Sequence, residues 1–265
     1  MLPGSQLQGK VALITGASRG IGRAIAVRFA AEGVRLALCA RDEEGLRRTA
    51  EELQTQSHAD VLAVKANISR LNDIRRFVAV AMKKFKRIDI LINNAGGAHI
   101  GGIRDTSDEA WEHHLQLKLL GYIRMAREVI PHMGSGGGGR IINVIGMAGK
   151  EPSAIMMVPG VTNAALISFT KSLSRELEPD HISVNAVHPG TTDTPLTDET
   201  FRSLAALLGK TSEELRLAAA QATGQGRIAT GEDIAGVVAF LASDEARFIN
   251  GTSINVDAGK SSGLW

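Results

Sequence analysis

The sequence predicts an α/β protein with one doubly wound domain, in which a mainly parallel seven-stranded sheet carries helices on both faces. Short apolar segments alternate with helical segments along the chain of 265 residues. The apolar segments are hydrophobic almost throughout, which is typical of parallel strands covered on both sides. A glycine-rich turn also follows the first of them, where a strand passes into a helix.

Seven apolar segments have the length and composition of strands. They are residues 11–17, 34–40, 60–66, 88–96, 140–146, 182–190 and 252–259. The first ends in a glycine turn, and the sixth stops at Pro189-Gly190, where the chain can no longer continue as a central strand. Strands joined by helical segments imply parallel pairing and right-handed crossovers.

Between the strands, apolar residues recur at helical spacing. These segments are residues 20–33, 42–56, 69–85, 107–133, 159–178 and 231–243, and residues 195–222 combine helical stretches with loops. The run GSGGGG at 134–139 is too short for an interdomain linker and is predicted to be a surface turn. Residues 1–265 are therefore predicted to form a single domain.

The composition limits the classes of function. Hydrophobic residues make up 44% and charged residues 22%, and the formal net charge is only +2, so nucleic acid is not an expected partner. No apolar run reaches the roughly 18 residues that cross a bilayer, and the N-terminus lacks a signal-peptide core. Cys39, the one cysteine, lies in an apolar run and is predicted to be a buried thiol. We expect a cytoplasmic protein without a membrane partner.

The first strand-to-helix turn has the sequence TGASRGIG and predicts a Rossmann-like dinucleotide site. Its glycines permit a tight turn, bring the backbone close to a pyrophosphate, and let the helix pack against the strand. The candidate cofactor residues in this turn are Gly16, Ser18, Arg19, Gly20, Ile21 and Gly22.

The end of the second strand indicates which dinucleotide is bound. An acidic residue there would accept hydrogen bonds from the ribose 2′-hydroxyl of NAD. The chain instead has Ala40 followed by Arg41, and Arg19 lies in the glycine loop. Two guanidinium groups suit a 2′-phosphate, so NADP is predicted in preference to NAD.

Further motifs follow in an order that resembles the short-chain dehydrogenases/reductases, from Lys10 to about Gly259. Asn93-Asn94-Ala95-Gly96 follows the fourth strand, Asn67-Ile68 the third, and Pro189-Gly190 with Thr192 and Thr194 the sixth. The resemblance implies that Asn94, Ala95 and Gly96 approach the adenosine ribose of the cofactor. It also implies that Asn67 and Ile68 flank the adenine and that residues 189–194 hold the nicotinamide carboxamide.

The catalytic positions depart from this family. The resemblance implies an Asn on the central helix, a Ser after the fifth strand, and a Tyr and a Lys four residues apart on the next helix. The residues at these positions are Lys118, Gly146, Pro159 and Asn163 respectively. The one tyrosine, Tyr122, lies on the other helix and is expected to serve in packing. Proton donation by the usual tyrosine is therefore excluded.

One hypothesis is that new groups replace the lost ones. Lys118 brings an ammonium to the site from the opposite helix, and Asn163 remains able to bind a ribose hydroxyl. His114 lies one turn before Lys118, and the two are expected to form an acid/base pair titrating near neutral pH. The alternative is that both are structural residues. Lys150, Glu151, Ser153, His99 and His188 are weaker candidates, and no cluster has the spacing of metal ligands.

Three classes of function remain open. The first is an atypical NADP(H)-dependent oxidoreductase acting on a small hydrophobic carbonyl or enoyl compound. The second is a non-redox lyase or hydrolase using His114, Lys118 or Glu151. The third is a catalytically inactive dinucleotide sensor or scaffold. The resemblance also implies that residues 191–225 form a substrate lid and that the chain assembles as a homodimer or homotetramer.

Overall fold

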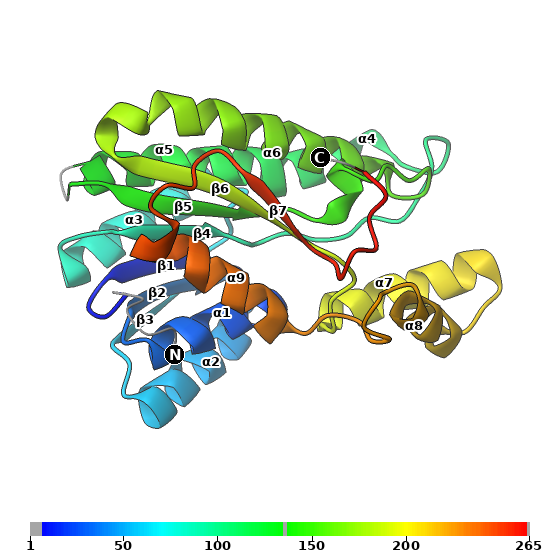
Figure 1. Cartoon of the computed structure of the whole chain (residues 1–265), viewed down its shortest axis with the longest axis horizontal. Helices are drawn as coiled ribbons and strands as arrows, with labels where there is room; N and C mark the ends of the chain where they lie inside the picture. Colours follow the sequence, from blue (N-terminus) through cyan, green and yellow to red (C-terminus); the bar gives the residue numbers. More distant parts are fainter. Residues whose placement is uncertain (1–6, 135–136, 264–265) are drawn as a thin grey trace.

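The computed structural model describes residues 7–134 and 137–263. Its centre is a seven-stranded sheet in the order β3-β2-β1-β4-β5-β6-β7, and all paired strands are parallel (Figure 1). The predicted fold class is confirmed. Of the glycine-rich run predicted to be a surface turn, residues 135–136 lie outside the described residues.

The strands occupy the centre of the predicted apolar segments. Their bounds are β1 Val11–Thr15, β2 Arg35–Ala40, β3 Val61–Lys65, β4 Ile90–Asn93, β5 Gly139–Val144, β6 Ile182–Pro189 and β7 Ser253–Val256. All seven strands are shorter than predicted, and β2 and β6 match their predicted segments to within one residue. The apolar runs extend past the last ladder hydrogen bonds into the buried ends of the loops.

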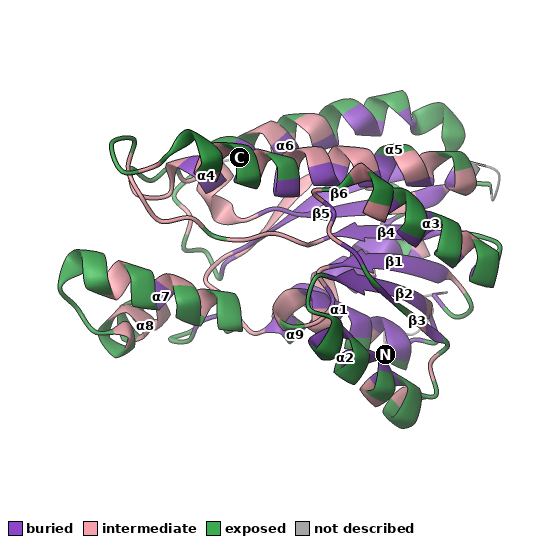
Figure 2. Cartoon of the chain, turned by 180° about the vertical axis from the view of Figure 1, so that it is seen from behind, coloured by how far each residue is buried: buried purple, intermediate pink, exposed green. Residues whose placement is uncertain are grey.

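Helices cover both faces of the sheet, as the sequence predicts (Figure 1). One face carries α1 Gly20–Ala31, α2 Glu43–Ser57 and α9 Gly231–Ala242; the other carries α3 Leu71–Phe85, α5 Leu120–Gly134 and α6 Met157–Glu176. Alternate residues of β1 enter the two cores: Ala12 and Ile14 pack on the α1 side, while Val11 and Leu13 pack on the α3 side. Figure 2 shows the sheet buried between these layers.

The long helix predicted over 107–133 is interrupted where a candidate site residue lies. The helix α4 covers Asp108–His114, a π-helical turn covers Leu115–Leu119, and α5 follows. The Leu120 N–H donates to the Leu115 carbonyl five residues earlier, instead of four. A π turn inserts one residue and is frequent at functional sites. It rotates Lys118 relative to His114, a shift that helical periodicity in the sequence does not reveal.

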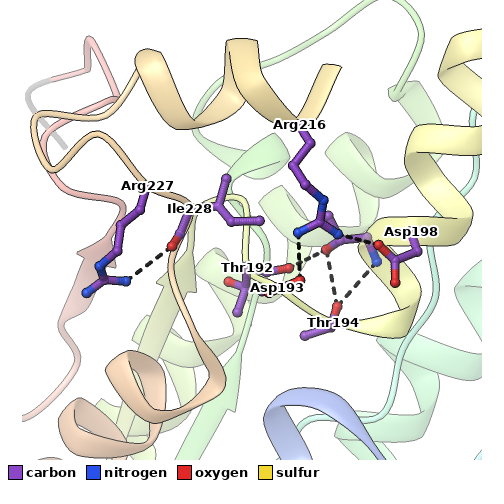
Figure 3. A network of polar contacts seen from close by, with 8 residues as sticks. Thr192, Asp193, Thr194, Asp198, Arg216, Arg227 and Ile228 are labelled. Atoms are coloured by element: carbon purple, nitrogen blue, oxygen red, sulfur yellow. Dashed lines mark hydrogen bonds and ion pairs between the residues drawn. The ribbon is translucent and has the colours of Figure 1, made fainter. Parts of the chain in front are cut away.

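Residues 191–225 contain two helices that stand away from the sheet, α7 Pro195–Leu208 and α8 Ser212–Gln221 (Figure 1). Arg216 of α8 joins them to the chain after β6, because its guanidinium binds both Asp193 and Asp198 (Figure 3). The side chains of Thr194 and Thr211 cap the two helices. Both helices are largely exposed (Figure 2), so this segment is held mainly by polar contacts at its base.

A buried polar chain connects the central strands to α6. The Asn93 Nδ2 donates to the Asn143 Oδ1 at 3.0 Å, and the Asn143 Nδ2 donates to the Thr170 Oγ1 at 2.9 Å. All three residues are buried. Because unpaired amides are costly in the interior, this chain fixes the position of α6 relative to β4 and β5.

We expect Asn143→Ala to lower the free energy of unfolding by about 2–3 kcal/mol, because it leaves the Asn93 and Thr170 groups without a buried partner. Thr170→Ala, which leaves one partner of Asn143 missing, is the matched control and should cost less. Urea unfolding measures both. A loss below that of the control would contradict a central role for Asn143.

Candidate functional site

A cavity of about 1020 Å³ opens at the carboxyl ends of the strands. In open α/β sheets this edge is where ligands bind, at the point between β1 and β4 where the strand order reverses. All but two of the predicted cofactor residues line the cavity, namely Gly16, Ser18, Arg19, Gly20, Ile21, Arg41, Ile68, Asn94, Ala95, Gly96, Asn163, Pro189, Gly190, Thr192 and Thr194.

Two glycines of the glycine-rich loop, Gly16 and Gly22, have no room for a side chain. Gly16 has φ +70, and a Cβ there would lie 2.8 Å from the Ala95 Cα. A Cβ on Gly22 would lie 2.3 Å from the Gly16 carbonyl oxygen, which explains why Gly22 belongs to the loop without lining the cavity. These two glycines are therefore required for the close packing of the loop, and the helix start beside them lines the cavity, where a pyrophosphate would bind.

Thr15 and Asn94 hold the loop after β1 against the loop after β4. The Thr15 Oγ1 accepts from the Asn94 N–H at 3.0 Å and from the Ala95 N–H at 3.1 Å. In return, the Asn94 Nδ2 donates to the carbonyls of Thr15 and Gly16. The two loops predicted to contact the cofactor thus form one rigid edge of the cavity.

The two predicted arginines line this end of the cavity but differ in their partners. The Arg19 Nη1 lies 2.9 Å from the Glu199 Oε1 of α7, and both side chains are about half exposed. Arg41 is exposed and makes no hydrogen bond or ion pair with any described residue. The guanidinium of Arg41 is thus available to an anionic group, and Ala40 beside it is buried.

Asn67 differs from its predicted role. Its Oδ1 accepts from the Ser69 N–H at 3.0 Å and from the Ser69 hydroxyl at 2.9 Å, so the amide closes a local turn. Its neighbours Ala66 and Ile68 line the cavity, whereas Asn67 does not. The physical reason is that a short amide bonds readily to the backbone two residues ahead.

The four exchanged family positions come together at the cavity wall: Lys118 of the π turn, Gly146 after β5, and Pro159 and Asn163 of α6. The Asn163 Nδ2 donates to the Gly146 carbonyl at 3.0 Å, and a Cβ on Gly146 would lie 3.2 Å from that nitrogen. Gly146 thus makes room for Asn163. The Asn163 Oδ1 is buried without a partner among the described residues, so one acceptor at this wall is left unsatisfied.

Lys118 is a nearly buried cation, with 8% of its surface exposed. Its stem passes Gly96, where a Cβ would lie 3.7 Å from the Nζ. No described residue forms an ion pair with Lys118, and burial lowers its pKa to about 8. At neutral pH Lys118 remains mainly protonated, yet it is a stronger acid than an ordinary lysine.

His114 does not behave as the sequence predicts. Burial, followed by the charge of Lys118, lowers its pKa to about 4, so it is neutral at pH 7 rather than titrating near it. Its Nε2 has no partner among the described residues, and His114 does not line the cavity. The correction follows from burial, which penalises the imidazolium. The charge of Lys118 therefore acts on the His114 imidazole, although His114 does not line the cavity.

The remaining polar candidates have structural partners or lie in the core. The Tyr122 hydroxyl donates to the Val144 carbonyl, the Lys150 Nζ donates to the Asn255 Oδ1, and the His99 Nε2 bonds the Thr106 hydroxyl. His188 is fully buried, and burial lowers its pKa to about 4. Ser153 is exposed and does not line the cavity.

Two further walls complete the cavity. One comes from α7, where Leu196, Thr200, Phe201 and Leu204 face the cavity. The other is the C-terminal segment with Lys260 and Ser261, which is tied down because the Glu151 Oε1 accepts from the N–H groups of Ser262 and Gly263. The α7 wall belongs to residues 191–225, which the family resemblance implies to be a lid, whereas no local motif marks the C-terminal wall. Leu207, Leu208 and Leu217 of the two lid helices are exposed.

Within residues 7–134 and 137–263, no group of three or more histidine, cysteine or carboxylate side chains has the geometry of a metal site. None of the helices in this part of the chain is both long and apolar enough to cross a membrane.

We expect Lys118→Met to stabilise the ligand-free protein at pH 7 by about 2–3 kcal/mol, because it removes a charge whose pKa is lowered by burial. Between pH 8 and 10.5 the unfolded chain holds a proton that the folded chain has lost. The wild-type protein therefore gains stability as pH rises through this interval, and the advantage of the variant shrinks. Denaturant unfolding at pH 7 and pH 10 measures both effects.

Lys150→Met is the matched control. Lys150 also lies near the cavity, but its ammonium donates to the Ser253 carbonyl and the Asn255 Oδ1, so its loss should destabilise the protein. Equal effects of the two substitutions would contradict the isolated state of the Lys118 charge.

Comparisons with known proteins agree with the fold and the cofactor motifs. The family model for short chain dehydrogenases matches residues 10–205. Short-chain reductase protein NovJ of Streptomyces niveus is 34% identical over 96% of this chain and 94% of its own length. Dehydrogenase/reductase SDR family member 4 of Caenorhabditis elegans is 32% identical over 96% of each chain.

Solved structures agree equally closely. L-sorbose reductase of Gluconobacter frateurii, complexed with NADPH and L-sorbose, superposes with a TM-score of 0.92 at 33% identity, covering 97% of this chain and 98% of that one. Actinorhodin polyketide ketoreductase with NADPH gives a TM-score of 0.92 at 30% identity, over 96% and 98% of the two chains. The chain belongs to the short-chain dehydrogenase/reductase family.

Proposed function

We propose that this protein is an NADPH-dependent reductase of a small hydrophobic carbonyl or enoyl compound, in which Lys118 takes over the work of the missing tyrosine and lysine. The observation that carries the proposal is a nearly buried, unpaired ammonium in the same cavity as an intact dinucleotide loop. Family membership and NADPH-bound reductase relatives support a reductase role.

The residues of the cavity fit a dinucleotide, and the dinucleotide is NADP(H). Gly16 and Gly22 have no room for a side chain, and the helix start between them lines the cavity, where a pyrophosphate binds. Arg41 has no partner in the described structure and suits a 2′-phosphate, in agreement with the NADPH complexes of the solved relatives. Asn163 lines the same cavity, and its Oδ1 has no partner among the described residues, which supports a role beside the cofactor.

When bound, NADPH supplies a hydride, and the chain must stabilise the negative charge that develops on the substrate and supply a proton. Gly146 and Pro159 have no hydroxyl to offer. The Lys118 ammonium is the cation on this wall of the cavity, and its lowered pKa makes it a better proton donor than a solvated lysine. In a site that excludes water, the same charge stabilises an alkoxide or enolate strongly.

Substrate enclosure comes from apolar side chains on both sides of this ammonium. Met147 and Met156 line the cavity next to the exchanged positions, and Phe201 and Leu204 line it from α7. We therefore retain the proposal that residues 191–225 act as a substrate lid. The proposal includes assembly as a homo-oligomer and a cytoplasmic location, as expected from the family resemblance.

Two other functions would give different results in measurements of NADPH binding and oxidation. A non-redox lyase or hydrolase would use Lys118 without cofactor turnover, and a dinucleotide sensor would bind NADPH without any turnover. His114 supports neither acid/base role directly, because it is neutral at pH 7 and lies behind the wall of the cavity. NADPH binding and oxidation measured together across carbonyl and enoyl compounds distinguish the three.

We expect Lys118→Met to lower kcat/KM for reduction by about 10²–10³-fold, since it removes a proton donor and a stabilising charge. In the wild-type protein the rate of reduction should fall as pH rises above about 8, because the Lys118 ammonium loses its proton there. NADPH oxidation followed by absorbance between pH 6 and 10 tests both statements.

Tyr122→Phe is the control for the family chemistry. The Tyr122 hydroxyl is buried and donates to the Val144 carbonyl, so its removal should leave the reduction rate within about twofold while slightly lowering stability. A hundredfold loss in Tyr122→Phe, or full activity in Lys118→Met, would contradict the assigned role of Lys118.

Arg41→Ala should weaken NADPH binding about tenfold and leave NADH binding nearly unchanged, because a charge-assisted contact to the 2′-phosphate is lost. Arg47→Ala, which removes an exposed cation paired with Glu51 on α2, controls for the change in net charge. Titrations by cofactor fluorescence measure all four affinities. Equal losses for both dinucleotides would show that Arg41 does not select the phosphate.

A further inference from the structure

We propose that the substrate is a 2-oxo carboxylic acid with an apolar body, whose carboxylate is bound by the Lys118 ammonium. This inference rests on the proposed reductase function and deepens it by naming the substrate class of the same cavity. It follows from the charges that line the cavity, from the apolar surfaces beside Lys118, and from the two tasks that a single ammonium must perform.

The Lys118 ammonium carries a charge that has no counter-ion among the described residues. The side chain is 8% exposed, and no described residue forms an ion pair or hydrogen bond with its Nζ. Burial alone shifts its pKa, and no carboxylate lies close enough to counter that shift. A buried ammonium without a counter-ion is costly, so a site that keeps one is suited to an anion brought by a ligand.

The carboxylates that line the cavity already accept hydrogen bonds from backbone N–H groups. The Asp42 Oδ1 accepts from the Gly45 N–H and caps α2. The Glu151 Oε1 accepts from two N–H groups of the C-terminal segment. Asp257 accepts from the N–H groups of Gly259 and Ser261. The described lining therefore contains no carboxylate that neutralises Lys118, and the anion must come from outside the chain.

Apolar surfaces of the cavity indicate the nature of the rest of the substrate. Beside the exchanged positions the cavity presents the thioethers of Met147 and Met156 and the ring of Pro159, and the α7 side adds Leu196, Phe201 and Leu204. These surfaces suit a hydrocarbon or aromatic body. An acid with such a body would place its charged end at Lys118 and its apolar end under α7.

The position of the reducible group in the substrate follows from the two tasks of the Lys118 ammonium. One ammonium has both to bind the carboxylate and to give a proton to the reduced carbonyl. This is possible when the carbonyl adjoins the carboxylate, so that oxygen atoms of both groups reach the same Nζ. Reduction then places a hydride on C2 and the Lys118 proton on the carbonyl oxygen. The products are a 2-hydroxy acid and NADP⁺, and Lys118 recovers its proton from solvent.

Binding without turnover tests the anion site. 3-Phenylpropanoate and 3-phenylpropanamide, which share an apolar body and have a charged and a neutral polar end respectively, are titrated by calorimetry into the protein saturated with NADP⁺. We expect the carboxylate to bind at least about tenfold more tightly than the amide, because only the carboxylate neutralises the ammonium. Equal affinities for the two compounds would overturn the proposal.

Two variants identify which lysine is responsible for the preference for the carboxylate. Lys118→Met should bind the two compounds with affinities within about twofold of each other, since the cation is gone. Lys260→Met removes an exposed lysine of the same cavity and should keep the preference for the carboxylate. A preference lost in Lys260→Met but kept in Lys118→Met would overturn the assignment. Unfolding curves of both variants confirm that each is folded.

Two further measurements separate this inference from the reductase function. If Lys118→Met weakens NADP⁺ binding as strongly as it weakens 3-phenylpropanoate binding, the ammonium belongs to the cofactor and the proposal fails. Phenylpyruvate and 4-phenyl-2-butanone are then compared as substrates of the wild-type protein. We expect phenylpyruvate to be reduced at least about tenfold more efficiently. Faster reduction of the neutral ketone would refute the acid specificity while leaving the reductase function intact.

Discussion

The hydrogen bonds between Thr15 and Asn94 are the constraint on which the site depends. They join the loop after β1 to the loop after β4, the two strands between which the sheet reverses its order. The carboxyl ends of the strands diverge at this point and leave a crevice, and the mutual bonds keep its two edges at a fixed separation. The glycine loop and Gly96 adjoin this junction, and the Lys118 stem passes beside Gly96.

The chemistry of the cavity depends on where charges are compensated. Its carboxylates are held by backbone N–H groups, Arg19 is paired with Glu199, and Lys118 is left uncompensated. An exposed ion pair contributes little, whereas an isolated charge in the interior is expensive. Of the charges named here, Lys118 is therefore the one that is buried without a compensating partner. That arrangement is typical of a functional site, where stability is given up for reactivity.

The cavity is closed by two segments that are far apart in the sequence. Arg216 links α8 to Asp193 and Asp198 and so holds α7 at the cavity mouth (Figure 3). Glu151 binds the backbone of residues 262–263 on the other side. Neither closure depends on a large apolar interface, and both α7 and α8 are mostly exposed. Segments held in this way open at lower free-energy cost than the core, which suits the passage of substrate.

The sequence by itself determined the fold, because buried parallel strands, helical periodicity and the glycine turn are local signals that agree with one another. It also determined most of the residues at the cofactor edge and the absence of the family's tyrosine from α6. Asn67 departed from expectation because its amide bonds locally. His114 departed because the interior suppresses its charge, a quantity that depends on the surrounding residues rather than on the sequence nearby.

Only the tertiary structure decided the state of Lys118. The π turn that orients it, the distance to Gly96, and the commitment of Asp42, Glu151 and Asp257 to backbone N–H groups all arise from contacts between distant segments. The wall formed by the C-terminal segment was hidden for the same reason, whereas the family resemblance already implied a lid over residues 191–225. A sequence lists which charges a protein carries, but burial and counter-ions decide what each charge can do, and both are set by the fold.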